Sequence, residues 1–444
     1  MRICVVGAGY VGLVTGSCLA SLGHEVVLVE SDAKKLQALR RGAVPIYEPG
    51  LPEIFSRAVK KKLLRFVHKV KDGLRLPSGR VQVVFIAVGT PPRPDGSADL
   101  SAVEHVTEEI ARHMEDYLVI AEKSTVPVET CHWVKRTVER WNKRRVPYDV
   151  VSTPEFLSEG SAVEDFLKPD RVVVGASSKR AEKLMRELYA PLRAPVLVVD
   201  PKSAELIKHA SNSFLATKIS FINAVAELCE RTGADVTEVA RGMGLDRRIG
   251  RHFLRPGIGF GGFCFPKDLD AFYWISKKKG CDFALLKAVQ SINERQKAWI
   301  PRQVEARLWN LEGKTVGLLG LSFKPKTDDL RFAPSLDVAQ ALIARGVRVQ
   351  AHDPVAMPKA RALKEFKGVK FCRGPYDCAR GADALAIVTE WPEYADLDLT
   401  KLADLMRNPL LLDGRNLLDP ERARRAGLFY AGVGRPEKIG PSTP

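Results

Sequence analysis

Residues 257–268 read GIGFGGFCFPKD, so four glycines precede a single cysteine, Cys264. Glycine loses more backbone entropy on folding than any other residue, so such a density needs a structural reason. We expect Gly261 and Gly262 to let a bulky ligand approach the backbone beside the thiol. The loop around Cys264 is therefore the first candidate for a site of chemistry.

The residues after the cysteine predict its electrostatic setting. Pro266 favours the first position of a helix, which leaves Cys264 just ahead of the helix N-terminus. A helix N-terminus and the adjacent Lys267 both favour the thiolate over the thiol. Asp268 lies four residues beyond Cys264, which is one turn along the expected helix.

Lys208 and Asn212 are a second pair of polar residues, spaced to share one face of a helix. A cysteine, a lysine, an asparagine and an aspartate are the parts of a covalent oxidation site. A thiol adduct lets an aldehyde give up a second hydride, and the resulting thioester is open to water. A buried thiol in a turn with surface charges nearby explains the same residues, so spacing alone leaves both interpretations open.

The chain opens with a dinucleotide-binding pattern, Gly7-x-Gly9-x-x-Gly12, between a strand and a helix. Glu30 closes the next strand, 23 positions after Gly7. In such a pattern the glycines allow a tight turn and close approach of a pyrophosphate, and the acid binds a ribose hydroxyl pair. A carboxylate at this position repels a 2′-phosphate, so the pattern favours NAD over NADP.

Strand and helix patterns alternate through the first 200 residues and again from about residue 313. Short buried runs separated by helix-length segments predict doubly wound, parallel sheets. The runs are RICVVG, EVVLVE, VQVVFIAVG, YLVIAEKS, YDVVST and RVVVGA, then KTVGLLGLSF, VRVQAHDP, ALAIVTEW and LLLDGRN. Between them, residues 202–232 keep helical spacing without proline or glycine, which predicts a long helix that bridges domains or forms a dimer core.

We therefore expect an α/β chain with two doubly wound, Rossmann-like domains joined by a central helical domain with a long connecting helix. The expected boundaries are 1–200 for NAD binding, 201–300 for the central, dimerising domain and 301–444 for the C-terminal domain. The C-terminal domain lacks the dinucleotide glycine pattern although Asp353 ends its second strand, so we expect a different nucleotide there. The last ten residues are expected to form a frayed tail.

Composition narrows the class of protein. The net charge of +16 comes from short, scattered basic clusters without interleaved aromatic residues, which argues against nucleic-acid binding. No apolar run reaches the length of a membrane span and the first residues already form a strand, so we expect a cytoplasmic protein. The eight cysteines lack zinc-type spacing, so we expect no metal site. We expect the seven cysteines other than Cys264 to be small buried hydrophobic residues.

Eight segments carry a resemblance that covers most of the chain. They are GAGYVG, VGTPPRPDG, KSTVPVET, TPEFLSEG, ELIKHASNSFLATKISFINAVAELCE, GFGGFCFPKD, GLSFKPKTDDLR and DGRN, in order from residue 7 to residue 416. With these motifs the chain resembles the UDP-glucose/GDP-mannose dehydrogenase family. The resemblance implies oxidation of the C6 hydroxyl of UDP-glucose to UDP-glucuronate with two NAD, a UDP-sugar-binding C-terminal domain, and a homo-oligomer that is at least a dimer.

The resemblance also implies roles for single residues. Cys264 matches the nucleophile that forms a thiohemiacetal and then a thioester. Lys208 and Asp268 match residues that steady the developing oxyanion and the attacking water, and Asn212 matches the residue that holds the sugar.

Thr125 and Glu155 match a pair beside that water, with Glu155 assisting hydrolysis of the thioester. The residues implied to bind NAD are Gly7, Gly9, Val11, Gly12, Glu30, Lys35, Thr90, Thr125, Glu159, Lys267 and Arg331. The residues implied to bind the sugar nucleotide are Glu155, Phe156, Leu157, Ser158, Glu159, Lys208, Asn212, Phe253, Leu254, Arg255, Pro256, Gly257, Gly261, Lys324 and Arg415.

Arg248 matches an arginine that reaches into a neighbouring subunit's site, and the adjacent Arg247 competes for the same role. Lys35 and Lys324 are equally consistent with ordinary surface lysines that bind no ligand. Glu30 departs mildly from the family pattern, since many relatives carry aspartate there.

Other substrates and other classes stay open. A GDP-mannose or N-acetylhexosamine nucleotide dehydrogenase would use the same chemistry, and the loop GFGGFCFPKD argues only against the N-acetyl type. A two-electron hydroxy-acid dehydrogenase would need no thiol. A non-catalytic NAD-binding interaction protein would bind both ligands without producing NADH.

Overall fold

The computed structural model describes residues 1–436, so residues 437–444, most of the expected tail, lie outside the described residues. The chain forms two compact units. Unit 1 contains Met1–Ser211 and Asp270–Cys281, and unit 2 contains Asn212–Leu269 and the chain from Asp282 onward. The three domain boundaries expected from the sequence stay a prediction.

Unit 1 is built on an eight-stranded sheet with the order β10-β9-β8-β7-β6-β1-β2-β3. Its strands are β1 (Arg2–Val6), β2 (Glu25–Val29), β3 (Leu64–Val67), β6 (Val83–Ile86), β7 (Leu118–Glu122), β8 (Tyr148–Ser152), β9 (Val172–Gly175) and β10 (Val196–Val199), and β4 (Arg75–Leu76) and β5 (Gly79–Arg80) form a separate hairpin. The six predicted strands are confirmed. The expectation of a fully parallel sheet is wrong at one step, because β8 and β9 pair antiparallel through Ser152 and Gly175.

The two faces of this sheet bury different side chains of the same strands. Ile3 and Val5 of β1 belong to one hydrophobic core, and Cys4 and Val6 belong to another. Successive side chains of a strand point to opposite faces, so the sheet is covered on both sides, as a doubly wound fold requires. The covering helices are α1 (Tyr10–Ser21), α2 (Ala33–Arg40), α3 (Leu51–Lys60), α4 (Val70–Gly73), α5 (Ser101–His113), α6 (Thr130–Trp141), α7 (Ala162–Leu167) and α8 (Lys179–Tyr189), with a 3-10 turn at Ala190–Leu192.

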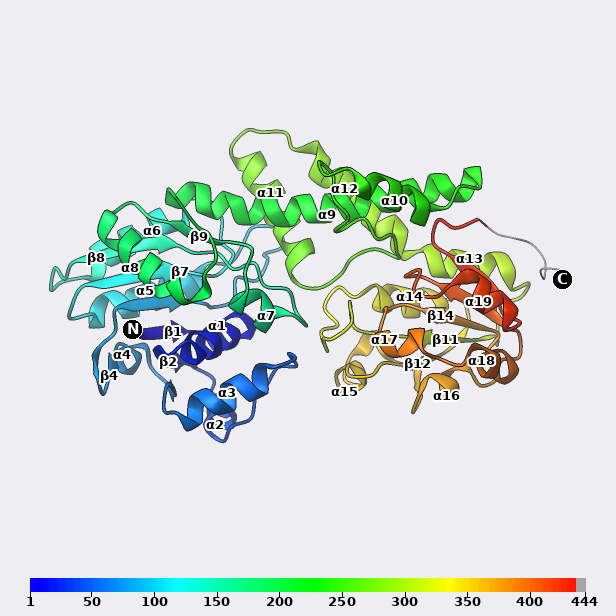
Figure 1. The fold of residues 1–444 in the computed structure, drawn as a ribbon, viewed down its shortest axis with the longest axis horizontal. Coiled ribbons are helices and arrows are strands. Elements are labelled where there is room, and N and C mark those ends of the chain that lie inside the picture. Colours follow the sequence, from blue (N-terminus) through cyan, green and yellow to red (C-terminus); the bar gives the residue numbers. More distant parts are fainter. Residues whose placement is uncertain (437–444) are drawn as a thin grey trace. The chain divides into compact units, whose positions relative to one another are not determined.

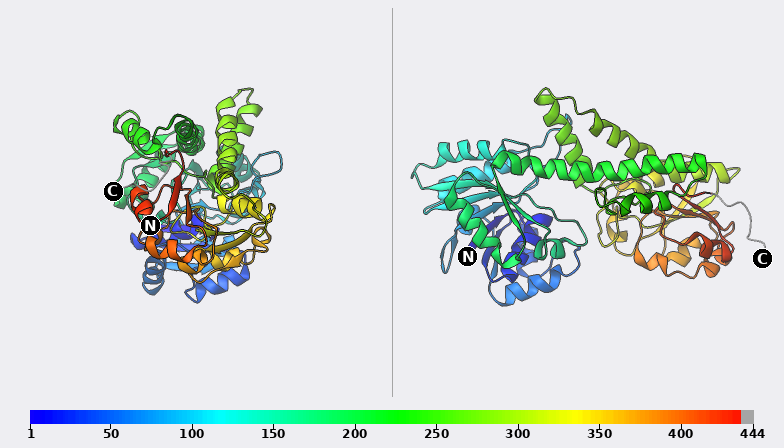
Figure 2. Two further views of the ribbon diagram at one scale, coloured as in Figure 1. Left: turned by 90° about the vertical axis from the view of Figure 1, so that its right-hand side faces the viewer. Right: turned by 45° about the horizontal axis from the view of Figure 1, so that its top comes forward.

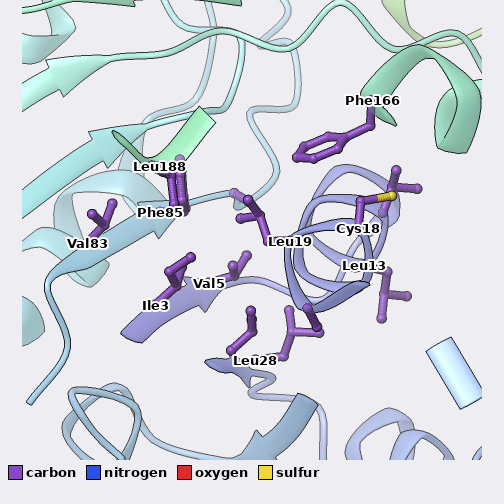
Figure 3. Packing of buried hydrophobic residues seen from close by; sticks show 14 of the residues in the cluster. Ile3, Val5, Leu13, Cys18, Leu19, Leu28, Val83, Phe85, Phe166 and Leu188 are labelled. Carbon is purple, nitrogen blue, oxygen red and sulfur yellow. The ribbon is translucent and has the colours of Figure 1, made fainter. Parts of the chain in front are cut away.

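Helix α1 lies deep in the first of these cores. Leu13, Cys18 and Leu19 of α1 lie among Ile3, Val5 and other strand side chains (Figure 3). Every residue from Gly12 to Ala20 is buried. The N-terminus of α1 is therefore held firmly at the end of β1, where the glycine pattern lies.

Unit 2 contains a six-stranded sheet in which all strands are parallel, in the order β13-β12-β11-β14-β15-β16. Its strands are β11 (Thr315–Leu319), β12 (Arg348–His352), β13 (Lys370–Phe371), β14 (Ala384–Ile387), β15 (Leu410–Asp413) and β16 (Phe429–Gly432). Its flanking helices are α14 (Pro334–Ile343), α15 (Met357–Ala360), α16 (Pro375–Ala379), α17 (Pro392–Ala395), α18 (Leu399–Leu405) and α19 (Pro420–Arg425), with a 3-10 turn at Lys364–Phe366 (Figure 1). The second doubly wound domain is confirmed.

The long helix expected over residues 202–232 is confirmed as α9 (Pro201–Thr232), which Figure 2 shows as one uninterrupted helix. The remaining helices are α10 (Val236–Leu245), α11 (Cys264–Lys278), α12 (Ala284–Lys297) and α13 (Trp299–Arg307). Helix α11 begins two residues earlier than expected, with Cys264 as its first residue and Pro266 as its third. The first-turn N–H groups of a helix have no intrahelical acceptor, so proline fits this position as well as the first.

One expectation about the cysteines is wrong. Cys281 is exposed, because it follows the chain reversal at Gly280 (φ 72°) after α11. Cys264 is also exposed, and the other six are buried.

Candidate active site

The turn between β1 and α1 fits the pyrophosphate of a dinucleotide. Gly7 has a φ of 100°, and a Cβ on it would lie 2.5 Å from the carbonyl oxygen of Ala87. A Cβ on Gly12 would lie 1.8 Å from the carbonyl oxygen of Gly7, so α1 packs directly on the turn. A Cβ on Gly9 would meet nothing within 4 Å, which leaves open space at the helix N-terminus, where a phosphate binds.

Glu30 follows β2 directly and is almost fully buried. Its Oε1 accepts a 2.9 Å hydrogen bond from the backbone N–H of Asp32, and its Oε2 lies 3.0 Å from Nζ of Lys35. Lys35 is therefore held against the acid. The carboxylate stands at the carboxyl end of β2, where the ribose of a dinucleotide binds, so the residues present fit NAD.

Two predicted threonines meet beyond the carboxyl ends of β6 and β7. Thr90 Oγ1 donates a 3.0 Å hydrogen bond to the carbonyl oxygen of Thr125. The hydroxyl of Ser124 donates a 2.9 Å hydrogen bond to the carbonyl oxygen of Val88. The segments that follow these two strands are thus tied together.

Glu155 and Lys208 form a buried ion pair in unit 1. Glu155 Oε1 lies 3.0 Å from Lys208 Nζ, and the side chains are 5% and 4% exposed. Glu155 Oε2 accepts a 2.6 Å hydrogen bond from the backbone N–H of Leu157, and the ring of Phe156 lies 5.4 Å from Lys208 Nζ. Burial of an ion pair costs desolvation energy, so such a pair just beyond the carboxyl end of β8 is a candidate for function.

Lys123 is a buried cation that the sequence analysis misses. Its Nζ donates a 3.1 Å hydrogen bond to the carbonyl oxygen of Thr153. Desolvation lowers the pKa of Lys123 to about 8, with smaller effects from the charges of Glu155 and Lys208. A Glu-Lys pair at the end of a buried run was the available signal, because ligands bind at the carboxyl ends of parallel strands.

The start of α11 carries three predicted residues of unit 2, and a fourth, Asn212 of α9, is bonded to one of them. Asp268 is 1% exposed, and its Oδ2 accepts a 2.6 Å hydrogen bond from Nδ2 of Asn212. Asp268 Oδ1 lies 2.7 Å from Nζ of Lys267. Cys264 begins the same helix and is exposed. The positive end of the helix favours a thiolate at this position.

The structure gives a different reason for the glycines before the cysteine. A Cβ on Gly261 would lie 2.3 Å from the carbonyl oxygen of Phe332. Gly262 has a φ of 80°, and a Cβ on it would lie 2.7 Å from the ring of Phe323. A side chain at either position would collide with protein atoms, so packing alone requires glycine here, and the approach of a bulky ligand stays a prediction. The glycines let the loop pass closely along its neighbours and so place Cys264.

Phe253 has a φ of 63°, which bulky residues rarely adopt. Its ring lies 6.4 Å from that of Phe265, which meets the ring of Phe260 edge-on at 5.6 Å. Phe253 nevertheless stays partly exposed. Residues with strained backbone cluster at active sites and ligand sites, so Phe253 stays a candidate for substrate binding. Of the other residues predicted here, Leu254, Pro256 and Gly257 are buried and Arg255 is exposed.

Arg415 is anchored inside unit 2. Its Nε donates a 2.8 Å hydrogen bond to the carbonyl oxygen of Val388 and lies 3.3 Å from Oε2 of Glu390. Its Nη1 donates a 2.9 Å hydrogen bond to the carbonyl oxygen of Gly259. The guanidinium therefore joins the glycine loop to the end of β14. Lys324 is half-buried beside the ring of Phe323.

Asp353 follows β12 as expected, but its carboxylate is used within the domain. Its Oδ2 accepts hydrogen bonds from the backbone N–H groups of Leu321 (2.7 Å) and Ser322 (3.0 Å) and from Nε1 of Trp391 (3.1 Å). Glu30, by contrast, accepts one backbone N–H and pairs with one lysine. A nucleotide in this domain is therefore not expected to use Asp353 as NAD uses Glu30.

The two remaining arginines have local carboxylate partners. Arg248 is exposed and binds Asp246 through Nε (3.0 Å) and Nη2 (2.6 Å), not another predicted site residue. Arg331 pairs with Asp329 at 2.6 Å, and its guanidinium lies 4.5 Å from the centre of the Phe263 ring. The other predicted residues are Val11 in the first turn of α1 and Ser158 and Glu159 in the loop after Leu157.

Among the described residues, no group of three or more His, Cys, Asp and Glu side chains is arranged to hold a metal ion. None of the helices within residues 1–436 combines the length and apolarity needed to cross a membrane.

Comparison with known proteins covers most of the chain. Residues 1–193 match the NAD binding domain of the UDP-glucose/GDP-mannose dehydrogenase family, residues 202–295 its central domain and residues 317–420 its UDP binding domain. UDP-glucose 6-dehydrogenase TuaD of Bacillus subtilis is 44% identical over 435 residues, which cover 98% of this chain and 93% of that protein. UDP-glucose 6-dehydrogenase of Pseudomonas aeruginosa is 45% identical over 449 residues, which cover 98% of each chain.

A solved structure agrees with these matches. The UDP-glucose dehydrogenase of the hyperthermophilic archaeon Pyrobaculum islandicum has a TM-score of 0.90 to this chain at 42% identity, over 98% of this chain and 97% of that one. The matches confirm the predicted fold and NAD as the cofactor. Because all three domain models match in order and both relatives are more than 40% identical over nearly their full length, the chain belongs to the UDP-glucose/GDP-mannose dehydrogenase family.

Proposed function

We propose that this chain oxidises the C6 hydroxyl of UDP-glucose to the carboxylate of UDP-glucuronate, with two NAD used in succession. The observation that carries the proposal is the first turn of α11, where an exposed Cys264 is followed by a buried Asp268 bonded to Asn212. The relatives named UDP-glucose 6-dehydrogenase support this substrate.

The residues of unit 1 hold the cofactor. Gly7 and Gly12 shape the turn, and Gly9 leaves the space for the pyrophosphate. The Glu30 carboxylate accepts hydrogen bonds from the ribose hydroxyls. Each of the two oxidations transfers one hydride to bound NAD, which is the chemistry that this cofactor supplies. The chain itself must keep the reacting carbon in place between the two oxidations.

Cys264 achieves this by covalent capture. The first oxidation removes a hydride and a proton from the alcohol and leaves an aldehyde. The thiolate sulfur of Cys264 then bonds to the aldehyde carbon, and the oxygen takes up a proton to give a thiohemiacetal. Loss of a second hydride and the hydroxyl proton gives a thioester. Water breaks the carbon–sulfur bond, the acid leaves and the thiol is restored, so four electrons leave the substrate.

The buried charges serve the water step in this proposal. The Lys208 ammonium stabilises the oxyanion that forms on the thioester carbon, and Glu155 accepts the proton of the attacking water, which Thr125 orients. Asp268 assists with the same water, and Asn212 holds the sugar. The 3.0 Å Glu155–Lys208 pair and the 2.6 Å Asn212–Asp268 hydrogen bond support these roles. Burial strengthens each of these electrostatic interactions.

We also infer a homo-oligomer, at least a dimer, that works in the cytoplasm. Helix α9 exposes Phe214, Phe221 and Leu228, spaced by seven residues, which a second copy would cover. Arg248 is exposed and available to a neighbouring subunit. The exposed catalytic thiol needs a reducing compartment to stay reduced, which favours the cytoplasm.

The test is the amount of NADH formed per sugar nucleotide when UDP-glucose, or separately GDP-mannose, is limiting. We expect two NADH per UDP-glucose. One NADH would make the chain a two-electron dehydrogenase. A response to GDP-mannose alone would move the substrate to that nucleotide sugar.

The covalent step has its own test. Cys264→Ala should abolish formation of UDP-glucuronate, whereas Cys281→Ala, which removes the other exposed thiol, should leave it unchanged. Acid formation by Cys264→Ala at the wild-type rate would rule out a covalent step at this residue.

A further inference from the structure

One turn of α9 presents three buried residues, two of which hydrogen-bond the chain that follows Thr125. Glu205, Lys208 and His209 lie at positions i, i+3 and i+4 of the helix and so share one face. Lys208 forms the ion pair with Glu155. Glu205 and His209 have no part in the steps above, yet each hydrogen-bonds the backbone between the end of β7 and the first turn of α6.

Glu205 binds the N-terminus of α6 with both carboxylate oxygens. Its Oε2 accepts a 2.6 Å hydrogen bond from the backbone N–H of Glu129, and its Oε1 accepts a 2.8 Å hydrogen bond from that of Cys131. Glu129 is the N-cap residue of α6, has a left-handed φ of 82° and provides no side-chain cap. The carboxylate of another helix therefore supplies the cap that α6 lacks.

His209 holds the same segment closer to Thr125. Its Nε2 donates a 2.9 Å hydrogen bond to the carbonyl oxygen of Val126, and its ring stacks on Phe272 with the ring centres 5.8 Å apart. The preceding carbonyl, that of Thr125, accepts the hydrogen bond from Thr90 Oγ1. Two successive carbonyl groups are thus fixed, which holds the backbone that carries the Thr125 side chain.

We infer that Glu205 and His209 are positioning residues, which fix the Thr125 segment to the helical turn that carries Lys208. The inference rests on the proposed function, because that function places both Thr125 and Lys208 at thioester hydrolysis. Without these contacts the segment and the first turn of α6 would open more often. A displacement of about 1 Å can cost on the order of a hundredfold in rate, so limited opening is enough to slow turnover.

The first test compares Glu205→Gln with Glu227→Gln, which alters an exposed carboxylate of the same helix. The amide introduced at position 205 points an NH2 donor at a backbone N–H, so one of the two cap hydrogen bonds is lost. We expect amide hydrogen exchange over residues 124–131 to become about tenfold faster in Glu205→Gln only. We also expect kcat to fall about tenfold, with little change in the KM for UDP-glucose.

The second test separates the hydrogen bond of His209 from its packing. Glutamine at this position keeps a donor for the Val126 carbonyl oxygen, and leucine does not. His209→Leu should lower kcat about fivefold and speed exchange of the segment, while His209→Gln should stay within about twofold of wild type. Equal losses in both variants would remove His209 from the inference.

The inference is overturned if exchange and kcat are unchanged in Glu205→Gln and His209→Leu. It is also overturned if kcat falls only in proportion to the folded fraction, measured by circular dichroism. Failure of the proposed function looks different, because the wild-type enzyme would then form fewer than two NADH per UDP-glucose. The exchange comparison still decides in that case whether the two residues hold the segment.

Discussion

Glu122 shows what burial does to a charge beside the candidate site. It ends β7 and is 1% exposed. Its Oε1 accepts a 2.9 Å hydrogen bond from the backbone N–H of Ser124, and its Oε2 has no hydrogen-bond partner among the described residues. Desolvation raises the pKa of Glu122 from 4.5 to about 8, so the carboxyl is mostly protonated at neutral pH.

This shift predicts a pH-dependent stability. Between pH 4.5 and about 8 the folded state binds more protons at Glu122 than the unfolded state, so the free energy of unfolding falls as the pH rises. Glu122→Gln removes this titration. The variant should gain stability relative to wild type across that window, by at most about 1.4 kcal/mol per pH unit, in urea unfolding at each pH.

Glu227→Gln alters an exposed carboxylate, so the free energy of unfolding of this variant should change with pH as that of the wild type does. If that of Glu122→Gln also changes as the wild type does, the Glu122 carboxyl does not titrate with a raised pKa.

Spacing in the sequence predicts which residues share one helical turn. It does not predict which charged residues are buried. The prediction of a helix start beside Cys264, with Asp268 one turn further on, is confirmed to within two residues, because α11 begins at Cys264 itself and not at Pro266. Lys123 and Glu205 were not predicted, because a charged residue is normally taken as exposed and their backbone partners are distant in sequence. The partners of such residues exist only in the folded chain.

At the scale of elements, Gly9 and Gly12 serve different purposes within one motif. A side chain on Gly12 would collide with the Gly7 carbonyl, whereas one on Gly9 would enter open space. We therefore expect Gly12→Ala to lower both stability, by roughly 1–3 kcal/mol, and NAD affinity. Gly9→Ala should leave the Tm within about 2 °C of wild type but weaken NAD binding at least about tenfold, because the methyl occupies the phosphate space.

Thermal unfolding and calorimetric titration with NAD distinguish these two variants. Wild-type NAD affinity in Gly9→Ala would show that the open space is not the pyrophosphate site. An unchanged Tm in Gly12→Ala would mean that α1 can shift without cost.

Most strands and the long helix α9 could be predicted from the sequence, because long buried runs indicate strands and unbroken helical spacing indicates a helix. Two strands of the first sheet, β3 and β10, were not predicted. They are partly exposed edge strands of four residues, which lack a long buried run. The antiparallel pairing of β8 with β9 was not predictable from either strand. Strand direction depends on the connection through α7, and hydrophobic pattern carries no direction.

At the scale of the whole molecule, one chain leaves an apolar stripe uncovered. Phe214, Phe221 and Leu228 are 64%, 51% and 60% exposed and lie two helical turns apart on α9. Single exposed apolar residues are common, but a repeated stripe along a helix is typical of a helix-packing interface. The oligomer proposed above would bury this stripe against a second copy.

Phe221→Glu tests that arrangement, because it places a charge in the middle of the stripe. Its control is Trp309→Glu, which changes an exposed aromatic residue in the loop before β11. Light scattering after gel filtration should give at least two chains for wild type and Trp309→Glu and one chain for Phe221→Glu. Since Arg248 is proposed to act in a neighbouring subunit, the single chain should also lose turnover, and Arg248→Ala should lose turnover while the assembly stays unchanged. A Phe221→Glu protein that stays oligomeric would place the interface elsewhere, and a fully active single chain would remove Arg248 from the active site.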